Sequence, residues 1–210
     1  MGKNYIITLG RQYGAGGREI GEILSEKLSI RYLDKELLRM VSDQSGIEES
    51  YFHVSDEKPG DNLVYRLVKS MTPDTGKPSM GSNLLAGDNL FRFQKEVIEK
   101  VADSGESCVI VGRCADFILK DYENLISVFV YADEESRKER IVRRTNYREA
   151  EVSKIMKKMD KERMDYYHYY TGKNWSDPAH YDLCFDSGKL GAEKCADLII
   201  AYLKLKGFLD

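Results

Sequence analysis

A short apolar segment near the amino terminus runs directly into a cluster of glycines, and this junction limits the possible folds strongly. From Tyr5 the chain reads YIITLGRQYGAGGREIG, with glycines at positions 10, 14, 16, 17 and 21. Glycines let consecutive backbone amides turn inward around an anion, because no side chains stand in the way. The segment therefore predicts a strand, a phosphate-binding loop over residues 10–21, and a helix that begins near Gly17.

The helix expected after the loop supports this interpretation. Apolar residues recur at helical spacing at Ile20, Ile23, Leu24 and Leu28. The unpaired amides at the start of this helix, and the positive end of its dipole, would point at a phosphate in the loop. A purely structural turn is the alternative. The residues that we expect to contact nucleotide phosphates are Gly14, Ala15, Gly16, Gly17, Arg18 and Glu19.

The loop departs from the usual form G-x-x-x-x-G-K-[ST], in which the lysine reaches the outer phosphates and the hydroxyl binds magnesium. Gly17 takes the lysine position if Gly16 is the last loop glycine, and no Ser or Thr follows. Arg18 is the nearest cation, so we expect its guanidinium to supply the phosphate charge. Glu19 stands near the missing hydroxyl, where it either stabilises the first turn of the helix or binds Mg²⁺.

The composition argues against several classes of protein. A chain of 210 residues with no linker predicts a single domain over residues 1–210. The formal net charge of -3 disfavours a nucleic-acid binder, and no apolar run is long enough to span a membrane. The first strand starts at once and leaves no room for a signal peptide, and the four cysteines lack metal-ligand spacing. We therefore expect a cytoplasmic protein with no membrane or nucleic-acid partner.

Strand-like and helix-like segments alternate along the chain. Apolar strand-like runs occupy 30–34, 108–111, 126–131 and 183–185, and helical patterns occupy 90–101, 133–144, 145–165 and 192–203. This alternation predicts an α/β fold whose parallel sheet is covered on both faces. Ligands of such sheets bind at the carboxyl ends of the strands, where Gly10, Asp34 and Arg113 all fall. Residues 50–88 hold three of the four prolines, which is typical of loops and mobile helices.

Four segments carry a resemblance to a known family. They read GAGGREIG from Gly14, YLDKEL from Tyr32, VIVGRCAD from Val109, and YYTG from Tyr169 with Trp175 close behind. In these segments the chain resembles the cytidylate kinase-like proteins of the nucleoside monophosphate kinase class, in particular a divergent group with a GxGGREIG loop. The resemblance implies a three-layer P-loop kinase fold, a helical acceptor-binding region over 34–90, a lid over 145–175, and ATP with Mg²⁺ as cofactors.

The resemblance also implies where a phosphate acceptor would bind. Asp34 and Arg39 would face the acceptor, and Arg113 resembles the arginine of the GRD motif that clamps the acceptor phosphate. In the family the acidic residue follows that arginine directly, whereas here two residues intervene before Asp116. A helix that begins at Arg113 would still place Asp116 on the same face. There Asp116 would read a base amino group, hold magnesium-bound water, or form a structural pair with Arg113.

The expected lid carries a cluster of cations. Lys154, Lys157 or Lys158, and Lys161 recur on one helical face, and Arg163 follows. Closure of that face over the phosphates would exclude water, which is a competing acceptor, whereas a solvated charged face is the alternative. Arg163 is the stronger candidate because the resemblance runs through this region. The aromatic run YYHYY that follows either packs between lid and core or stacks on a base.

Phosphoryl transfer requires alignment and positive charge around the moving group, which Arg18, Arg113 and Arg163 would supply as catalytic residues. The leading hypothesis is a kinase that transfers phosphate from ATP to a small-molecule acceptor, a nucleoside monophosphate, with CMP or dCMP first by resemblance. The alternatives are a kinase for another small molecule and a nucleotide-binding sensor that no longer transfers phosphate. An Arg18 that shares a phosphate site with Arg113 would favour catalysis, and an outward Arg18 paired with a surface carboxylate would favour the sensor.

Overall fold

The computed structural model describes residues 4–34, 40 and 87–210, and these form a parallel sheet covered by helices. Its five strands run in the order β2-β3-β1-β4-β5. Every pairing is parallel, and β1 lies at the centre between β3 and β4. The strands are β1 (Ile6–Arg11), β2 (Arg31–Leu33), β3 (Cys108–Val111), β4 (Leu125–Tyr131) and β5 (Leu183–Asp186). The predicted parallel α/β fold is confirmed.

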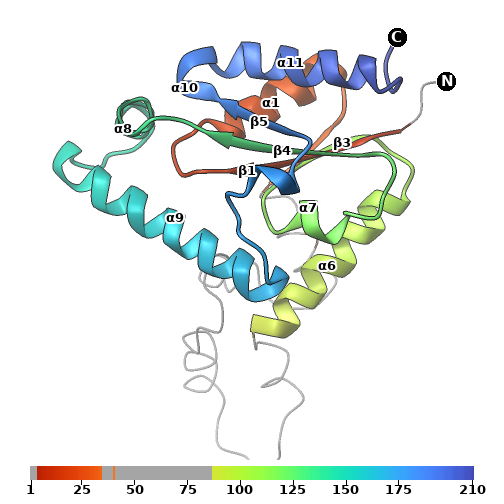
Figure 1. Ribbon diagram of the computed structural model, residues 1–210, viewed down its shortest axis with the longest axis horizontal. Coiled ribbons are helices and arrows are strands. Elements are labelled where there is room, and N and C mark those ends of the chain that lie inside the picture. Colours follow the sequence, from red (N-terminus) through yellow and green to blue (C-terminus); the bar gives the residue numbers. More distant parts are fainter. Residues whose placement is uncertain (1–3, 35–39, 41–86) are drawn as a thin grey trace, which may run out of the picture.

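Helices cover both faces of this sheet. They are α1 (Gly17–Leu28), α6 (Gly87–Asp103), α7 (Ala115–Ile118), α8 (Glu134–Arg144), α9 (Glu149–Thr171), α10 (Ser187–Leu190) and α11 (Ala192–Leu205), with a 3-10 turn, η1, at Pro178–His180. In Figure 1, α1, α10 and α11 lie above the sheet, and α6, α7 and α9 lie below it. None of the helices in these described ranges is long and apolar enough to cross a membrane.

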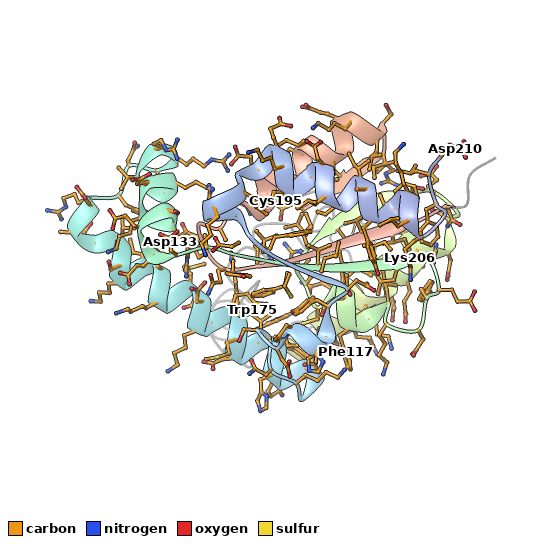
Figure 2. All side chains as sticks on the ribbon, turned by 45° about the horizontal axis from the view of Figure 1, so that its top comes forward. Phe117, Asp133, Trp175, Cys195, Lys206 and Asp210 are labelled. Atoms are coloured by element: carbon orange, nitrogen blue, oxygen red, sulfur yellow. The ribbon has the colours of Figure 1, made fainter. Side chains whose placement is uncertain are left out.

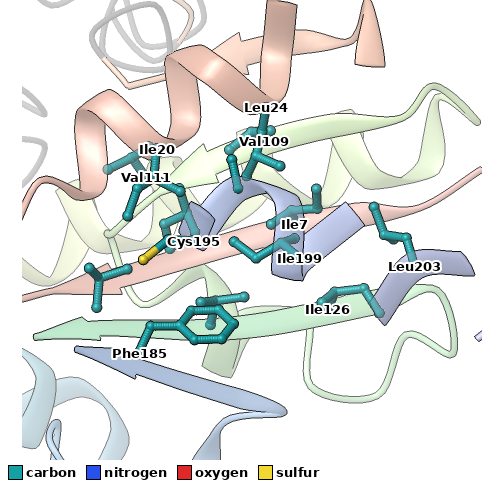
Figure 3. Packing of buried hydrophobic residues seen from close by; sticks show 14 of the residues in the cluster. Ile7, Ile20, Leu24, Val109, Val111, Ile126, Phe185, Cys195, Ile199 and Leu203 are labelled. Carbon is teal, nitrogen blue, oxygen red and sulfur yellow. The ribbon is translucent and has the colours of Figure 1, made fainter. Parts of the chain in front are cut away.

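Alternate residues of the central strand pack on opposite faces, as the pleat of a strand requires. Ile7 of β1 lies in the cluster that α1 and α11 cover, whereas Ile6 packs with residues of α6 and α7. Figure 3 shows the first cluster, in which the side chain of Ile7 on β1 lies next to Ile199 of α11. Both faces are therefore buried, which explains why the strands read as continuous apolar runs rather than alternating ones.

The apolar face of α11 gives a direct test of this packing. Ile199 is fully buried in the core cluster, whereas its neighbour Leu198 is 44% exposed. Ile199→Val removes one methyl group and should lower the free energy of unfolding by about 1 kcal/mol, because the cavity is only partly refilled. Leu198→Ala removes three carbon atoms but should cost less than about 0.5 kcal/mol. Urea denaturation measures both values, and a larger loss in Leu198→Ala would contradict this orientation of α11.

One expected helix is longer than predicted, and one expected region lies mostly outside the described residues. The long polar helix, expected to end near residue 165, continues as α9 to Thr171 and so includes the aromatic run. The expected acceptor-binding region over 34–90, with Arg39, lies largely outside the described residues. Within the described chain, the carboxyl ends of β1, β2 and β3 place Gly10, Asp34 and Arg113 at one edge of the sheet, as predicted.

Candidate active site

The loop between β1 and α1 has the backbone geometry of an anion-binding turn. Gly14 and Gly16 have left-handed φ angles of 79° and 80°, a region that residues with a side chain rarely adopt. A β-carbon on Gly14 would also lie only 2.8 Å from Cδ1 of Ile141. Gly16 is the N-cap of α1 and has no side chain to cap the first amides of that helix. These amides therefore suit an anionic ligand.

Side chains from α8 and α10 hold the carbonyl groups of this loop. The Ser187 hydroxyl donates to the carbonyl oxygen of Ala15 at 2.6 Å. Nη1 of Arg140 donates to the carbonyl oxygen of Gly14 at 2.8 Å. Because these bonds fix the carbonyls on the outside of the turn, the loop is held in shape without a ligand.

An ion pair between α8 and α9 holds the backbone of Tyr13 in the same loop. Oδ1 of Asp160 accepts the Tyr13 amide at 2.7 Å, and the other carboxylate oxygen pairs with Arg137. Nε of Arg137 donates to the Tyr13 carbonyl oxygen at 2.8 Å. Both helices are thereby tied to the phosphate-binding loop. The sequence did not indicate this role for Asp160, which lies on the helix expected to form a lid.

A pocket of about 420 Å³, called here the loop pocket, lies beside the turn. Its walls include residues 11–14 and 16–18 together with residues from α8 and α9. The cations that line it are Arg11, Arg18, Arg140, Arg144 and Arg163. Guanidinium groups present planar forks of donors that match phosphate oxygens, so this concentration of arginine suits a polyphosphate.

A narrower pocket of about 40 Å³, called here the strand-end pocket, lies where β3 ends. Arg113 and Asp116 line it, with aromatic residues from α9 and Trp175. Figure 2 shows Trp175 on the α9 side of the sheet, away from Cys195 of α11. Arg11 and Arg163 line both pockets. The two pockets therefore meet at a wall formed by these two arginines.

Arg163 of α9 lines both pockets and bonds to the end of the strand that leads into the loop. Its Nη1 donates to the carbonyl oxygen of Arg11 at 3.1 Å, and its guanidinium carbon lies 5.5 Å from the ring centre of Tyr13. A guanidinium over an aromatic face is stabilised by cation–π attraction. Arg163 thus connects α9 with the end of β1 and the first residues of the loop.

The backbone after β3 is unusual around Arg113. Gly112, Arg113 and Cys114 have consecutive φ angles of 77°, 60° and 53°. Non-glycine residues adopt such angles at a cost of about 1 kcal/mol or more, and they cluster at functional sites. Burial lowers the pKa of the Arg113 guanidinium to about 10, although Tyr166 and Asp34 act in the opposite direction. Arg113 is therefore still a cation at neutral pH.

The predicted helix starting at Arg113 is wrong, because α7 begins at Ala115. The left-handed backbone at Arg113 and Cys114 precludes a helix there, so the expected common face of Arg113 and Asp116 does not form. Asp116 is buried and accepts a hydrogen bond from the Tyr167 hydroxyl at 2.7 Å. Its observed partner is therefore a tyrosine of α9.

The burial of Asp116 leads to a prediction about pH. Burial raises the pKa of this carboxyl above its ordinary value of 3.8, and the bond from Tyr167 offsets only part of that. The folded protein thus holds the Asp116 proton more tightly than the unfolded chain, so this group's contribution to stability falls as the pH rises above about 4. Asp116→Asn keeps an acceptor for Tyr167 and removes the titration. In thermal melts, the melting temperature of Asp116→Asn should rise relative to that of the wild type as the pH is raised from about 4 to about 7. A difference in melting temperature that does not change with pH would contradict the raised pKa of Asp116.

Arg18 and Asp34 form an ion pair at the sheet edge. Nε of Arg18 lies 2.6 Å from Oδ2 of Asp34, whose side chain is only 7% exposed, whereas that of Arg18 is 54% exposed. The charge of Asp34 also raises the pKa of Arg113, so this carboxylate lies near Arg113 as well as Arg18. The partner of Arg18 is therefore a buried carboxylate beside the strand-end pocket, which differs from both arrangements that the sequence suggested.

Glu19 points from the first turn of α1 toward α8. Its Oε2 lies 3.1 Å from Nη2 of Arg144 and 3.8 Å from Nε of Arg140. These contacts tie the two helices together across the loop pocket. In the part of the chain that the structure describes, no group of three or more His, Cys, Asp or Glu side chains is arranged to hold a metal ion.

The lid lysines lie away from both pockets. Helix α9 turns Val152, Met156, Tyr166 and Tyr167 toward the body of the protein, which leaves the opposite face in solvent. Helical spacing identifies a common face but not its direction, so the expectation that these lysines cover the phosphates is not met here. The lysines of α9 are all exposed and line neither pocket; they are Lys154, Lys157, Lys158 and Lys161.

The aromatic run of α9 packs against the body of the protein. Tyr170 stacks on Phe91 of α6 with ring centres 4.0 Å apart, and the Tyr166 hydroxyl donates to Gln94 at 2.9 Å. Packing between α9 and the core, the first of the two expected roles, is thus observed. Tyr166 and Tyr167 also line the strand-end pocket, where they add apolar surface to the site.

Comparison with known proteins agrees with this geometry. A family model described as the cytidylate kinase-like family matches residues 6–189. The crystal structure of an uncharacterized protein from Eubacterium ventriosum ATCC 27560 is similar, with 29% sequence identity and a TM-score of 0.70 over 96% of this chain and 99% of that chain. A comparison with curated proteins finds no match.

Two more distant structures share the fold. Shikimate kinase from Bacteroides thetaiotaomicron has 13% identity and a TM-score of 0.53, over 95% of this chain and 98% of that chain. Shikimate kinase from Acinetobacter baumannii in complex with shikimate has 15% identity and a TM-score of 0.52, over 97% of this chain and 94% of that chain. The sheet, the glycine loop and the family match together show that this chain has a P-loop kinase fold and belongs to the cytidylate kinase-like family.

Proposed function

We propose that this protein is a small-molecule kinase that transfers a phosphoryl group from ATP to a nucleoside monophosphate, with CMP or dCMP as the first candidate. The observation that carries the proposal is the junction of the two pockets, whose common wall contains Arg11 and Arg163. Donor and acceptor phosphates must lie next to each other for transfer, with positive charge between them. Membership of a kinase-like family supports the reaction class.

The loop pocket is the proposed donor site. Backbone amides of the loop and the first turn of α1 would hold the ATP phosphates, and Arg140 and Arg144 would stand on the α8 side. Mg²⁺ neutralises phosphate charge when bound and is usually held by one or two carboxylates together with substrate phosphates. The proposed carboxylate is either Glu19 beside the loop pocket or Asp116 in the strand-end pocket.

The strand-end pocket is the proposed acceptor site. Arg113 supplies a cation there, which fits an acceptor that already carries a phosphate, and Asp34 and Asp116 lie beside it. An oxygen of the acceptor phosphate forms a bond to the γ-phosphorus of ATP, the bond to the bridging oxygen breaks, and ADP leaves with that electron pair. We place the rest of the acceptor site in residues 34–90, including Arg39, and the lid in residues 145–175, with Arg163 as its phosphate contact.

Two other functions have support from the fold or from the loop. The fold is also that of the two shikimate kinases, and a kinase for another small molecule is the first alternative. A nucleotide-binding sensor without transfer is favoured by the loop, which lacks both the usual lysine and the usual hydroxyl.

ADP release distinguishes these functions. Wild-type protein would be given ATP and Mg²⁺ with CMP, dCMP, UMP, AMP, GMP, shikimate or dephospho-coenzyme A offered separately, beside a reaction without acceptor. The proposal predicts that CMP or dCMP gives the largest stimulation over that control. Stimulation by shikimate or dephospho-coenzyme A alone would contradict a nucleotide acceptor, and saturable ATP binding without stimulation would favour the sensor.

A further inference from the structure

The side chain of Arg11 occupies the space above Gly17, where the usual loop has its lysine. A β-carbon on Gly17 would lie 2.8 Å from Cβ and 2.9 Å from Cγ of Arg11. Real β-carbons do not approach other atoms so closely, because the repulsion between them is too strong. A lysine at position 17 and an arginine at position 11 therefore exclude each other in this backbone.

A second glycine makes room for the guanidinium of Arg11. A β-carbon on Gly112 would overlap Nη1 of Arg11 and lie 3.0 Å from its Cζ. The Arg11 side chain thus starts at the carboxyl end of β1, passes over Gly17 and ends against the backbone that follows β3. Two glycines on separate segments are needed for this one path.

The path of Arg11 crosses from one pocket to the other. Arg11 lines the loop pocket and the strand-end pocket, and Gly112, which its guanidinium reaches, is next to Arg113. Arg163 bonds to the Arg11 carbonyl oxygen at 3.1 Å and so fixes the start of this side chain against α9. Arg18, the cation nearest to position 17 in sequence, also lines the loop pocket, but its Nε is paired with Asp34.

We infer that Arg11 replaces the missing loop lysine and that its guanidinium binds the phosphate group lying between the two pockets. A guanidinium offers several donors in one plane, so it can contact phosphate oxygens from both sides of the junction. Glycine is then required at position 17, because it has no β-carbon that would occupy the space of the Arg11 side chain. The role of Arg11 in phosphoryl transfer rests on the proposed function, whereas its contact with phosphate would exist even in a protein that binds phosphate without catalysis.

Binding of inorganic tripolyphosphate, measured by titration calorimetry, tests the contact directly. Arg11→Met keeps the unbranched stem of the side chain and removes its charge, and it should raise the dissociation constant at least about tenfold. The matched control is Arg31→Met, since Arg31 lies on β2 at the opposite end of the sheet and pairs at the surface with Glu106 at 3.5 Å. This control should bind as the wild type does. Equal affinity in Arg11→Met and the wild type would overturn the inference.

An exchange of the two positions tests whether arginine and lysine are equivalent here. Gly17→Lys alone should weaken tripolyphosphate binding, because its stem meets Cβ and Cγ of Arg11. The double variant Arg11→Gly with Gly17→Lys removes both atoms and supplies a new cation. It should bind tripolyphosphate at least about tenfold more tightly than Arg11→Gly. A double variant that binds no better than Arg11→Gly would contradict the exchange.

The outcomes separate this inference from the proposed function. Wild-type protein that binds tripolyphosphate but forms no product from ATP and any acceptor would contradict the kinase, while the affinity ratio for Arg11→Met would still decide the inference. Wild-type protein that does not bind tripolyphosphate would overturn the inference itself.

Discussion

Arg113→Met should lower kcat/KM for phosphoryl transfer by about 100-fold, a typical loss for one charge-stabilising contact in a site that excludes water. Arg113 stands in the narrow strand-end pocket, and burial has already removed part of the water around its guanidinium. Methionine fills much of the same volume without the charge. The KM for the acceptor should rise more than the KM for ATP, because Arg113 lines the strand-end pocket and not the loop pocket.

Two variants separate the chemistry of Arg113 from its effect on folding. Arg143→Met is the matched control, since Arg143 is exposed on α8 and bonds to a carbonyl of its own helix; its activity should stay within about twofold of the wild type. Arg113→Gly should be as inactive as Arg113→Met but more stable, because glycine accepts the left-handed backbone at φ 60°. Activity of Arg113→Met within threefold of the wild type would remove Arg113 from the site.

Asp160→Ala should lower the free energy of unfolding by about 3 kcal/mol. The substitution leaves Arg137, whose side chain is 8% exposed, without the carboxylate that it pairs with, and it also removes the acceptor of the Tyr13 amide. The unpaired charge of Arg137 should cost more stability than the lost hydrogen bond to the Tyr13 amide. Because Tyr13 belongs to the phosphate-binding loop, tripolyphosphate affinity should fall as well. Chemical denaturation and calorimetry measure the two effects.

The same helix provides the controls for Asp160. Asp165→Ala changes an exposed carboxylate of α9 and should leave unfolding within about 0.5 kcal/mol of the wild type. In the double variant Asp160→Ala with Arg137→Met, Arg137 no longer leaves an unpaired charge, so part of the lost stability should return. Additive losses in the double variant would show that the two residues do not act as a pair.

The fold could be predicted from local patterns because these patterns reflect local physics. Continuous apolar runs are what a strand buried on both faces requires, and the glycines at 14 and 16 supply the left-handed angles of the loop. Arg113 was identified because it lies just beyond a buried strand, at the ligand-binding edge of a parallel sheet, and because it resembles the arginine of the GRD motif. These features depend on neighbours in sequence.

The residues that the sequence did not reveal depend on contacts between distant segments. Arg11 is the last residue of a buried strand, and this position could have marked it, but its path over Gly17 and Gly112 is a property of three segments at once. The arginines of α8 recur at helical spacing toward the loop, yet the sequence alone could not show that Arg140 bonds to Gly14. Spacing gives a face, and only packing gives its direction.

The partners of Arg18 and Asp116 were also missed because they come from distant segments. Arg18 lines the loop pocket, as its place next to the loop suggested, but its pairing with Asp34 at 2.6 Å arises only once β2 folds beside α1. The partner expected for Asp116 was three residues away, whereas Tyr167 comes from 51 residues further along the chain. Two left-handed residues prevented the helix that would have joined Arg113 and Asp116.

Transfer of label from γ-³²P-ATP tests the central claim most directly. Wild-type protein would be incubated with labelled ATP, Mg²⁺ and CMP or dCMP, and the products separated by chromatography, with Arg113→Met treated in parallel. The account predicts radioactive CDP or dCDP with the wild type and about 100-fold slower formation with Arg113→Met. Labelled inorganic phosphate alone, or no labelled product while ATP still binds, would contradict a kinase for these acceptors.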